Sequence, residues 1–127
     1  MSLLILVVDD EPDVELLFRQ QFRRDLRAGR FSMEFAQSAP MALQRIADAG
    51  EESLILILSD INMPGMSGLE LLSHIKHMYL KPPPVVMMIT AYGDAENFNT
   101  AKQLGADDFL TKPVDFNLLK EKLKLIH

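Results

Sequence analysis

Three short stretches of the chain are continuously apolar, and each has the length of a β-strand. They are Leu3–Val8, Leu54–Leu58 and Val85–Ile89. Continuous apolarity indicates burial on both faces, which is typical of strands in a parallel sheet. Two weaker strands are predicted at Phe31–Ala36, where apolar residues alternate with polar or small ones, and at Asp108–Thr111.

The segments between these strands show the three- and four-residue apolar spacing of amphipathic helices. The first predicted helix begins near Pro12, which suits a first helical turn, and Gly29 can end it. Its expected buried face consists of Val14, Leu17, Phe18 and Phe22.

Four more helices are predicted further along the chain. One contains Ala42–Ile46 and stops at Gly50, and the next contains Leu71–Tyr79. A weakly apolar helix covers about residues 94–104, and Asp115 is the expected N-cap of a last helix that reaches the C-terminus. The buried face of that last helix is expected to consist of Phe116, Leu119, Leu123 and Ile126.

Strands and helices therefore alternate five times, which predicts an α/β fold with a parallel sheet, right-handed crossovers and helices on both faces. The 127 residues, of which 48% are hydrophobic and 24% charged, fit one domain that covers residues 1–127. In such open sheets a ligand lies beyond the carboxyl ends of the strands. The residues that follow the strands are therefore the place to look for chemistry.

Charged or polar side chains follow four of the five predicted strands. Asp9 and Asp10 follow the first strand, and Asp60 follows the third. Thr90 follows the fourth strand, and Lys112 follows the fifth. Three carboxylates repel one another unless protons or a cation intervene, and Mg²⁺ takes oxygen ligands of this kind. An Asp carboxylate can also accept a phosphoryl group, provided that positive charge and hydrogen-bond donors meet the phosphoryl oxygens.

Further residues extend this pattern. They are the nonapeptide Asp60–Gly68 (DINMPGMSG), Ala91 after Thr90 and Pro113 after Lys112. Together with the two acids after the first strand, they resemble the receiver domain of two-component response regulators, and the resemblance covers essentially the whole chain. It implies a flavodoxin-like (βα)5 three-layer sandwich with the strand order 2-1-3-4-5.

The resemblance also implies a role for each residue of the set. Asp60 resembles the phosphoacceptor, and the implied Mg²⁺ ligands are Asp9, Asp10, Asp60 and the backbone carbonyl of Asn62. Lys112 resembles the clamp on the phosphoryl group, and the bond from this lysine to the following proline is cis in many members of the family.

Thr90 and Phe109 resemble the switch pair of this family, in which the hydroxyl moves toward the phosphoryl group and the aromatic ring swings inward. Phe109 lacks the hydroxyl of a tyrosine, so it can change rotamer without forming a hydrogen bond. Asn62 and Tyr92 each stand two residues after a site residue, and the resemblance implies that they tune the lifetime of the phosphoryl group.

The resemblance implies a phosphorylation-switched regulator rather than an enzyme with a turnover substrate. Its expected donor is the phosphohistidine of a sensor histidine kinase or a histidine phosphotransfer protein. The expected output face consists of the helix at residues 94–104, the strand Asp108–Thr111 and the C-terminal helix. A homodimer through that face and a fused or separate effector domain are both left open.

Two other classes of protein use similar residues. A phosphatase of the haloacid dehalogenase type has an Asp nucleophile, a Thr and a Lys, but its nucleophile follows the first strand and a second acid stands two residues on. This chain has Asn62 at that second position. A flavodoxin-like FMN-binding protein needs a phosphate-cradling loop after the first strand, where Asp9, Asp10 and Glu11 would repel a phosphate.

The composition narrows the expected partners. The net charge of −5 disfavours direct binding of nucleic acid. The absence of cysteine excludes disulfides and thiolate metal sites and fits a reducing compartment, so we expect a cytoplasmic location. No apolar run reaches the roughly eighteen residues that a membrane span needs.

Three groups of residues expected at the surface could each have a function, but each also has a simple structural explanation. His74 and His77 lie one helical turn apart without a third metal ligand, which favours solvated histidines. A cluster of arginines is interpreted as a solvated helix face rather than as a surface for an anionic partner. The cluster consists of Arg19, Arg23, Arg24, Arg27 and Arg30. Leu118 and Leu125 lie off the buried face of the last helix, either as ordinary exposed leucines or as part of a dimer or effector surface.

Overall fold

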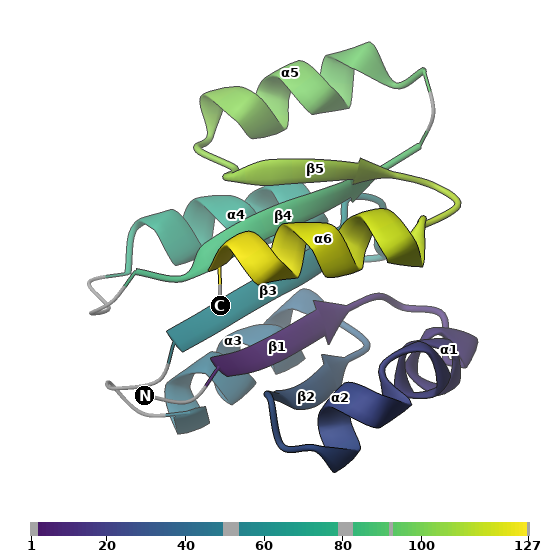
Figure 1. The fold of residues 1–127 in the computed structure, drawn as a ribbon. Coiled ribbons are helices and arrows are strands. Elements are labelled where there is room, and N and C mark those ends of the chain that lie inside the picture. The colour runs from purple at the N-terminus through teal and green to yellow at the C-terminus, as the bar shows by residue number, and fades with distance from the viewer. Residues whose placement is uncertain (1–2, 50–53, 79–82, 92, 127) are drawn as a thin grey trace.

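The computed structural model describes residues 3–49, 54–78, 83–91 and 93–126. Its centre is a parallel sheet in the order β2-β1-β3-β4-β5 (Figure 1). The five strands are β1 (Leu3–Val8), β2 (Ser32–Ala36), β3 (Leu54–Asp60), β4 (Val85–Thr90) and β5 (Asp108–Thr111). All neighbouring strands pair in parallel, so the predicted sheet type and strand order are both confirmed.

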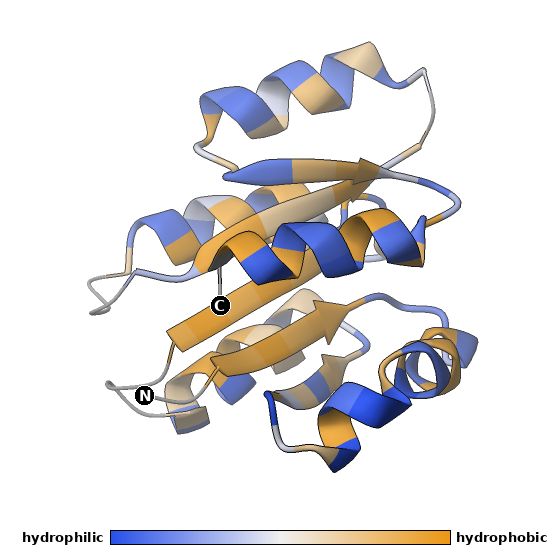
Figure 2. Cartoon of the chain, viewed as in Figure 1, coloured by the Kyte–Doolittle hydropathy of each residue, from blue (hydrophilic) through white to orange (hydrophobic). Residues whose placement is uncertain are grey.

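Helices cover both faces of the sheet and make the fold a three-layer sandwich (Figure 1). They are α1 (Asp13–Gln21), α2 (Arg23–Arg27), α3 (Ala39–Ala49), α4 (Gly68–Lys76), α5 (Ala95–Gln103) and α6 (Phe116–Ile126). Apolar residues of α1, α2 and α6 pack on one face, and those of α3, α4 and α5 pack on the other. The central strands β1, β3 and β4 are largely apolar, whereas the edge strands β2 and β5 also carry hydrophilic residues, as do the outer sides of the helices (Figure 2).

The prediction of one continuous first helix is wrong, because the chain bends at Phe22. This residue has φ −107° and ψ 17° and separates α1 from α2. Its buried ring lies against three other aromatic rings, with centroid separations of 6.2 Å to Phe18, 5.8 Å to Phe31 and 6.1 Å to Phe116. Tertiary packing of a large aromatic ring can override helix propensity, which is a weak preference for any one residue.

The expected buried face of the first helix is also wrong at Leu17, which is 44% exposed. The residues of α1 that pack on the sheet are Val14 and Phe18, four positions apart. Leu17 is turned by about 100° from Phe18 around the helix, which places it outside a narrow buried stripe. Leu16 is exposed as well.

The buried face predicted for the last helix is confirmed more closely. Leu119 and Leu123 are buried and Phe116 is half-buried, while Leu118 and Leu125 are exposed. Gly50, Tyr79, Tyr92 and the side chain of Ile126 lie outside the described residues. Among the described helices, none combines the length and the apolarity required to cross a membrane.

Two strands extend further than the apolar pattern predicts. β3 includes Ser59 and Asp60, and β4 includes Thr90. The register pairs Asp60 with Ile89, and it pairs Thr90 with Thr111 at the end of β5. Asp60 and Thr90 are therefore held by the sheet itself and not by a loop.

Candidate functional site

Three carboxylates meet at the carboxyl edge of the sheet. Asp9 and Asp10 follow β1, and Asp60 ends β3, the strand that pairs with β1 through Val8 and Ser59. One carboxylate oxygen from each acid lies within 4.8 Å of the other two. Asp60 is only 4% exposed, Asp9 is half-buried and Asp10 is exposed. In the described part of the chain, no other group of His, Cys, Asp or Glu side chains has spacing suited to a metal ion.

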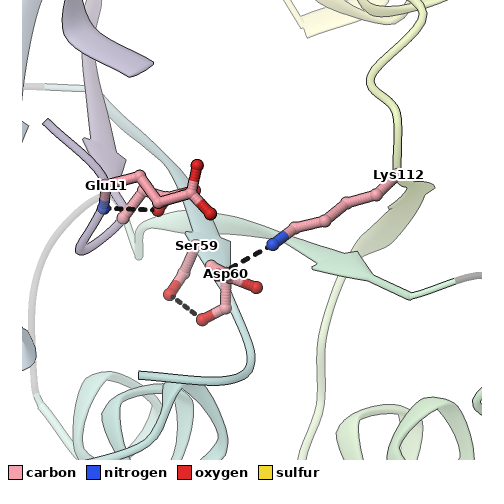
Figure 3. Close-up of polar contacts among 5 residues, drawn as sticks. Glu11, Ser59, Asp60 and Lys112 are labelled. Atoms are coloured by element: carbon pink, nitrogen blue, oxygen red, sulfur yellow. Dashed lines mark hydrogen bonds and ion pairs between the residues drawn. The ribbon is translucent and has the colours of Figure 1, made fainter. Parts of the chain in front are cut away.

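Lys112, the residue directly after β5, brings a positive charge to this pocket. Its backbone N–H donates to the carbonyl of Thr90 at 2.9 Å, which fixes the start of the side chain beside the pocket. The side chain then extends toward Asp60, and its Nζ lies 2.9 Å from Asp60 Oδ2 (Figure 3). The two side chains are 41% and 5% exposed, respectively, so a partly hydrated ammonium meets a carboxylate that water scarcely reaches.

The neighbours of Lys112 keep it protonated. Burial alone would lower the pKa of Lys112. The hydrogen bond to Asp60 and the negative charges of Asp60, Asp9 and Glu11 outweigh burial, and the net effect is a raised pKa. Lys112 is therefore a permanent cation at neutral pH, positioned to contact an anionic group bound at Asp60.

The surroundings of Asp9 affect the charge that its carboxylate carries. Partial burial raises the pKa of Asp9, the hydrogen bond from the Glu11 N–H to Asp9 Oδ1 (2.9 Å) lowers it, and the charge of Asp60 raises it again. The net effect is a raised pKa, so the charged form is less favourable here than in water. A hard divalent cation offsets such crowding, and carboxylate oxygens are the ligands that Mg²⁺ prefers. The donor set therefore fits Mg²⁺, and Asn62, whose carbonyl is a further implied ligand, lies exposed in the adjoining loop.

The backbone around Asp60 is held by close contacts that leave no room for a side chain at Gly68. The Gly68 N–H donates to the carbonyl of Ile61 at 2.8 Å, and a Cβ on Gly68 would lie 2.0 Å from the carbonyl oxygen of Asp60. The buried Ser59 hydroxyl donates to that same oxygen at 3.0 Å (Figure 3). Gly68 belongs to the nonapeptide, but no structural role was predicted for it from the sequence. Its residue type could have indicated one, since glycine often marks a close approach of two backbone segments.

Thr90 and Phe109 lie on neighbouring strands beside the pocket. Thr90 is buried, and its hydroxyl donates to the carbonyl of Leu110 at 3.5 Å, which is long for a hydrogen bond. Phe109 is half-buried, and its ring centroid lies 4.3 Å from that of Phe98 on α5. The contact with Phe98 was missed because the apolar pattern of this helix is weak. The bond from Lys112 to the following proline is cis, which agrees with the family resemblance seen in the sequence.

The histidine pair takes no part in a metal centre among the described residues. His74 and His77 are both exposed, and His77 Nδ1 lies 2.6 Å from the carbonyl oxygen of Ser73. The interpretation as solvated histidines stays a prediction.

The fold and the site together define a class: a doubly wound α/β protein with a buried aspartate, two further acids and a lysine at the carboxyl edge of its sheet. The model of the response regulator receiver domain family matches residues 5–124. The chain therefore belongs to the response regulator receiver domain family.

Individual relatives agree with this assignment. The chain is 37% identical over 116 residues to the response regulator protein PilR of Pseudomonas aeruginosa, covering 91% of this chain but only 24% of PilR. It is 29% identical over 120 residues to sporulation initiation phosphotransferase F of Bacillus subtilis, covering 94% of this chain and 90% of that protein. The crystal structure of the receiver domain of NtrX from Brucella abortus superposes with a TM-score of 0.77 at 32% identity, covering 95% of each chain.

The two alternative classes do not fit the observed topology. Asp60 ends the third strand in chain order, whereas a phosphatase of the haloacid dehalogenase type needs its nucleophile after the first. The residues after β1 are acids that crowd one another, which is the opposite of a phosphate-cradling loop.

Proposed function

We propose that residues 1–127 form one receiver domain that accepts a phosphoryl group on Asp60. The observation that carries this proposal is the environment of the Asp60 carboxylate, which is nearly buried, 2.9 Å from the Lys112 ammonium and beside two more acids. The alignment with sporulation initiation phosphotransferase F over 90% of that protein's length adds support.

The proposed chemistry is attack by an Asp60 carboxylate oxygen on the phosphorus of a phosphohistidine. An O–P bond forms as the N–P bond breaks, and the departing imidazole nitrogen takes up a proton. Lys112 already reaches Asp60, so its ammonium can contact a phosphoryl oxygen with little movement. Charge stabilisation and in-line placement are most of what phosphoryl transfer asks of a protein.

The residues that would hold Mg²⁺ are Asp9, Asp10, Asp60 and the backbone carbonyl of Asn62. When bound, the ion supplies positive charge to the phosphoryl oxygens. The contribution of the chain is the acid cluster itself, whose oxygens lie within 4.8 Å of one another and whose repulsion favours a cation between them.

The proposed switch runs from Thr90 to the output face. The hydrogen bond from the Thr90 hydroxyl to Leu110 is long, so the hydroxyl can leave it for a phosphoryl oxygen at small cost. Phe109 can then change rotamer and alter its ring contact with Phe98 on α5. The proposed output face consists of α5, β5 and α6. The output face exchanges between two or more conformations. Phosphorylation shifts their populations only by as much as the phosphoryl group stabilises one conformation more than another.

The proposal includes partners and a location. The phosphodonor is a sensor histidine kinase or a histidine phosphotransfer protein, and the location is cytoplasmic. An effector domain, fused or separate, receives the signal, and the exposed Leu118 and Leu125 of α6 are candidates for its contact surface or for a homodimer. The domain assists its own phosphorylation and dephosphorylation and has no other substrate.

Incubation with acetyl phosphate and Mg²⁺, followed by intact-mass measurement, tests the proposal. The wild type should gain one phosphoryl group, and Asp60→Asn should gain none. Asp48→Asn is the matched control, because Asp48 is an exposed acid on α3 away from the pocket, and it should gain one group. Equal labelling of wild type and Asp60→Asn would refute the assignment of the phosphoacceptor.

A further inference from the structure

A groove of about 950 Å³ lies between α2 and α6, beside Leu3 at the first residue of β1. The acidic pocket is at the other end of the strands, so the groove is separate from the proposed phosphorylation site. Six cationic side chains line it: Arg23, Arg24, Arg27, Arg30, Lys120 and Lys124. The four arginines belong to the cluster interpreted from sequence as a solvated helix face, and the fold adds two lysines from the other end of the chain.

The charge of the groove is opposite to that of the rest of the protein. Its lining has six positive side chains and one negative side chain, Asp25, which gives a formal charge of +5. The whole chain carries −5, so the residues outside the groove carry −10. A local positive field on an acidic protein marks a place where anions gather.

Most of these cations are not paired with another side chain in the described part of the chain. Arg19, outside the groove, differs in this respect, because it forms an ion pair with Glu15 one helical turn away at 2.9 Å. Within the groove, Arg30 pairs with Asp25 at 2.6 Å, and Lys120 Nζ lies 5.5 Å from the ring centroid of Phe22. No ion pair or side-chain hydrogen bond engages the remaining four cations anywhere in the described ranges. They are Arg23, Arg24, Arg27 and Lys124.

We propose that this groove binds a compact polyanion, namely a small molecule with two or more phosphate groups. Guanidinium groups can bind phosphate oxygens through two parallel hydrogen bonds, and here the arginines line the groove together with two lysines. The volume lies within the roughly 300–1,000 Å³ of small-molecule sites. The half-buried ring of Phe31 offers an apolar contact for the rest of the ligand.

The charge distribution selects a compact ligand over an extended one. The residues outside the groove carry −10 in total, so a nucleic acid or a long acidic polypeptide that extends past the groove meets a protein that is negatively charged overall. Repulsion there would offset the attraction within the groove. A ligand confined to the groove gains the attraction alone.

Calorimetric titration of the full chain with ATP and with inorganic tripolyphosphate tests the proposal. EDTA and low salt are used, so that no metal bridges a phosphate to the acidic pocket and screening stays weak. Both ligands should bind at one saturable site. Arg27→Gln on α2 and Lys124→Gln on α6 should each weaken binding about tenfold, the usual effect of losing a charged hydrogen bond.

Lys102→Gln is the matched control, because it also removes one exposed cation but from α5, outside the groove. It should change affinity less than about twofold, the small effect expected of a distant screened charge. Asp60→Asn should bind normally, so this result is independent of the proposed phosphorylation. Three outcomes would overturn the proposal: no saturable binding, equal affinity in the groove variants and Lys102→Gln, or tighter binding of polyglutamate or single-stranded DNA than of ATP.

Discussion

Replacing Asp9 with asparagine should stabilise the metal-free protein. The variant removes one of three charges whose oxygens lie within 4.8 Å of one another, and its amide oxygen can still accept from the Glu11 N–H. Two unit charges 4.8 Å apart repel by about 3.5 kcal/mol at an effective dielectric of about 20, and by about 0.9 kcal/mol in bulk water. Asp9 is only half-buried and Lys112 attracts it, so we expect a net gain of about 1 kcal/mol.

Thermal unfolding in EDTA measures this gain. About 1 kcal/mol should raise the Tm by roughly 4 °C for a domain of this size. Asp48→Asn, an exposed acid outside the pocket, should leave the Tm nearly unchanged. Mg²⁺ should reverse the order, because it stabilises the wild type by binding the native state and has fewer ligands in Asp9→Asn.

The pH dependence gives an independent check with a definite sign. The folded protein raises the pKa of Asp9 above its ordinary value of 3.8, chiefly through burial, so the folded state holds this proton more tightly than the unfolded chain. The charged form therefore destabilises the fold at neutral pH, and the penalty disappears as the pH falls through the raised pKa toward 3.8. The advantage of Asp9→Asn should shrink over that range. An advantage that is absent at neutral pH, or that grows in acid, would refute this account of the pocket.

Two further variants test the parts that surround Asp60. Gly68→Ala places a Cβ 2.0 Å from the Asp60 carbonyl oxygen and should cost about 3 kcal/mol in urea unfolding. Gly29→Ala, which meets no atom within 4 Å at φ +71°, should cost about 1 kcal/mol from its backbone conformation alone, and equal costs would contradict the close contact at Gly68. Lys112→Met should slow labelling by acetyl phosphate about a hundredfold while the fold remains, because a charge at the phosphoryl oxygens is lost. Lys102→Met should label at the wild-type rate, and the same rate in both variants would remove Lys112 from the mechanism.

The sheet could be predicted well because its central strands are apolar on both faces. Continuous runs such as Leu3–Val8 have few other interpretations once turns and helices flank them. The bend at Phe22 could not be predicted, because the apolar spacing of four residues continues through it to Leu26, which also packs on the core. The bend is set by a cluster of rings from distant segments, and periodicity within one helix does not report such contacts.

The acids and the lysine of the site could be predicted because parallel strands bring their carboxyl ends to one edge. Order along the chain therefore indicated proximity in space for residues as distant as Asp60 and Lys112. The strand order itself needed the family resemblance. The basic groove could not be predicted in the same way. Its arginines on α2 and its lysines on α6 come from two helices, and no pattern in the sequence specifies how these helices lie relative to each other.

Locating the phosphoryl group on the chain tests the central claim most directly. Borohydride reduces an acyl phosphate on aspartate to homoserine, and tandem mass spectrometry then places the changed residue after labelling with acetyl phosphate and Mg²⁺. The proposed mechanism predicts homoserine at position 60 and nowhere else. Homoserine at position 9 or 10, or a stable phosphate on a hydroxyl or histidine side chain, would contradict it.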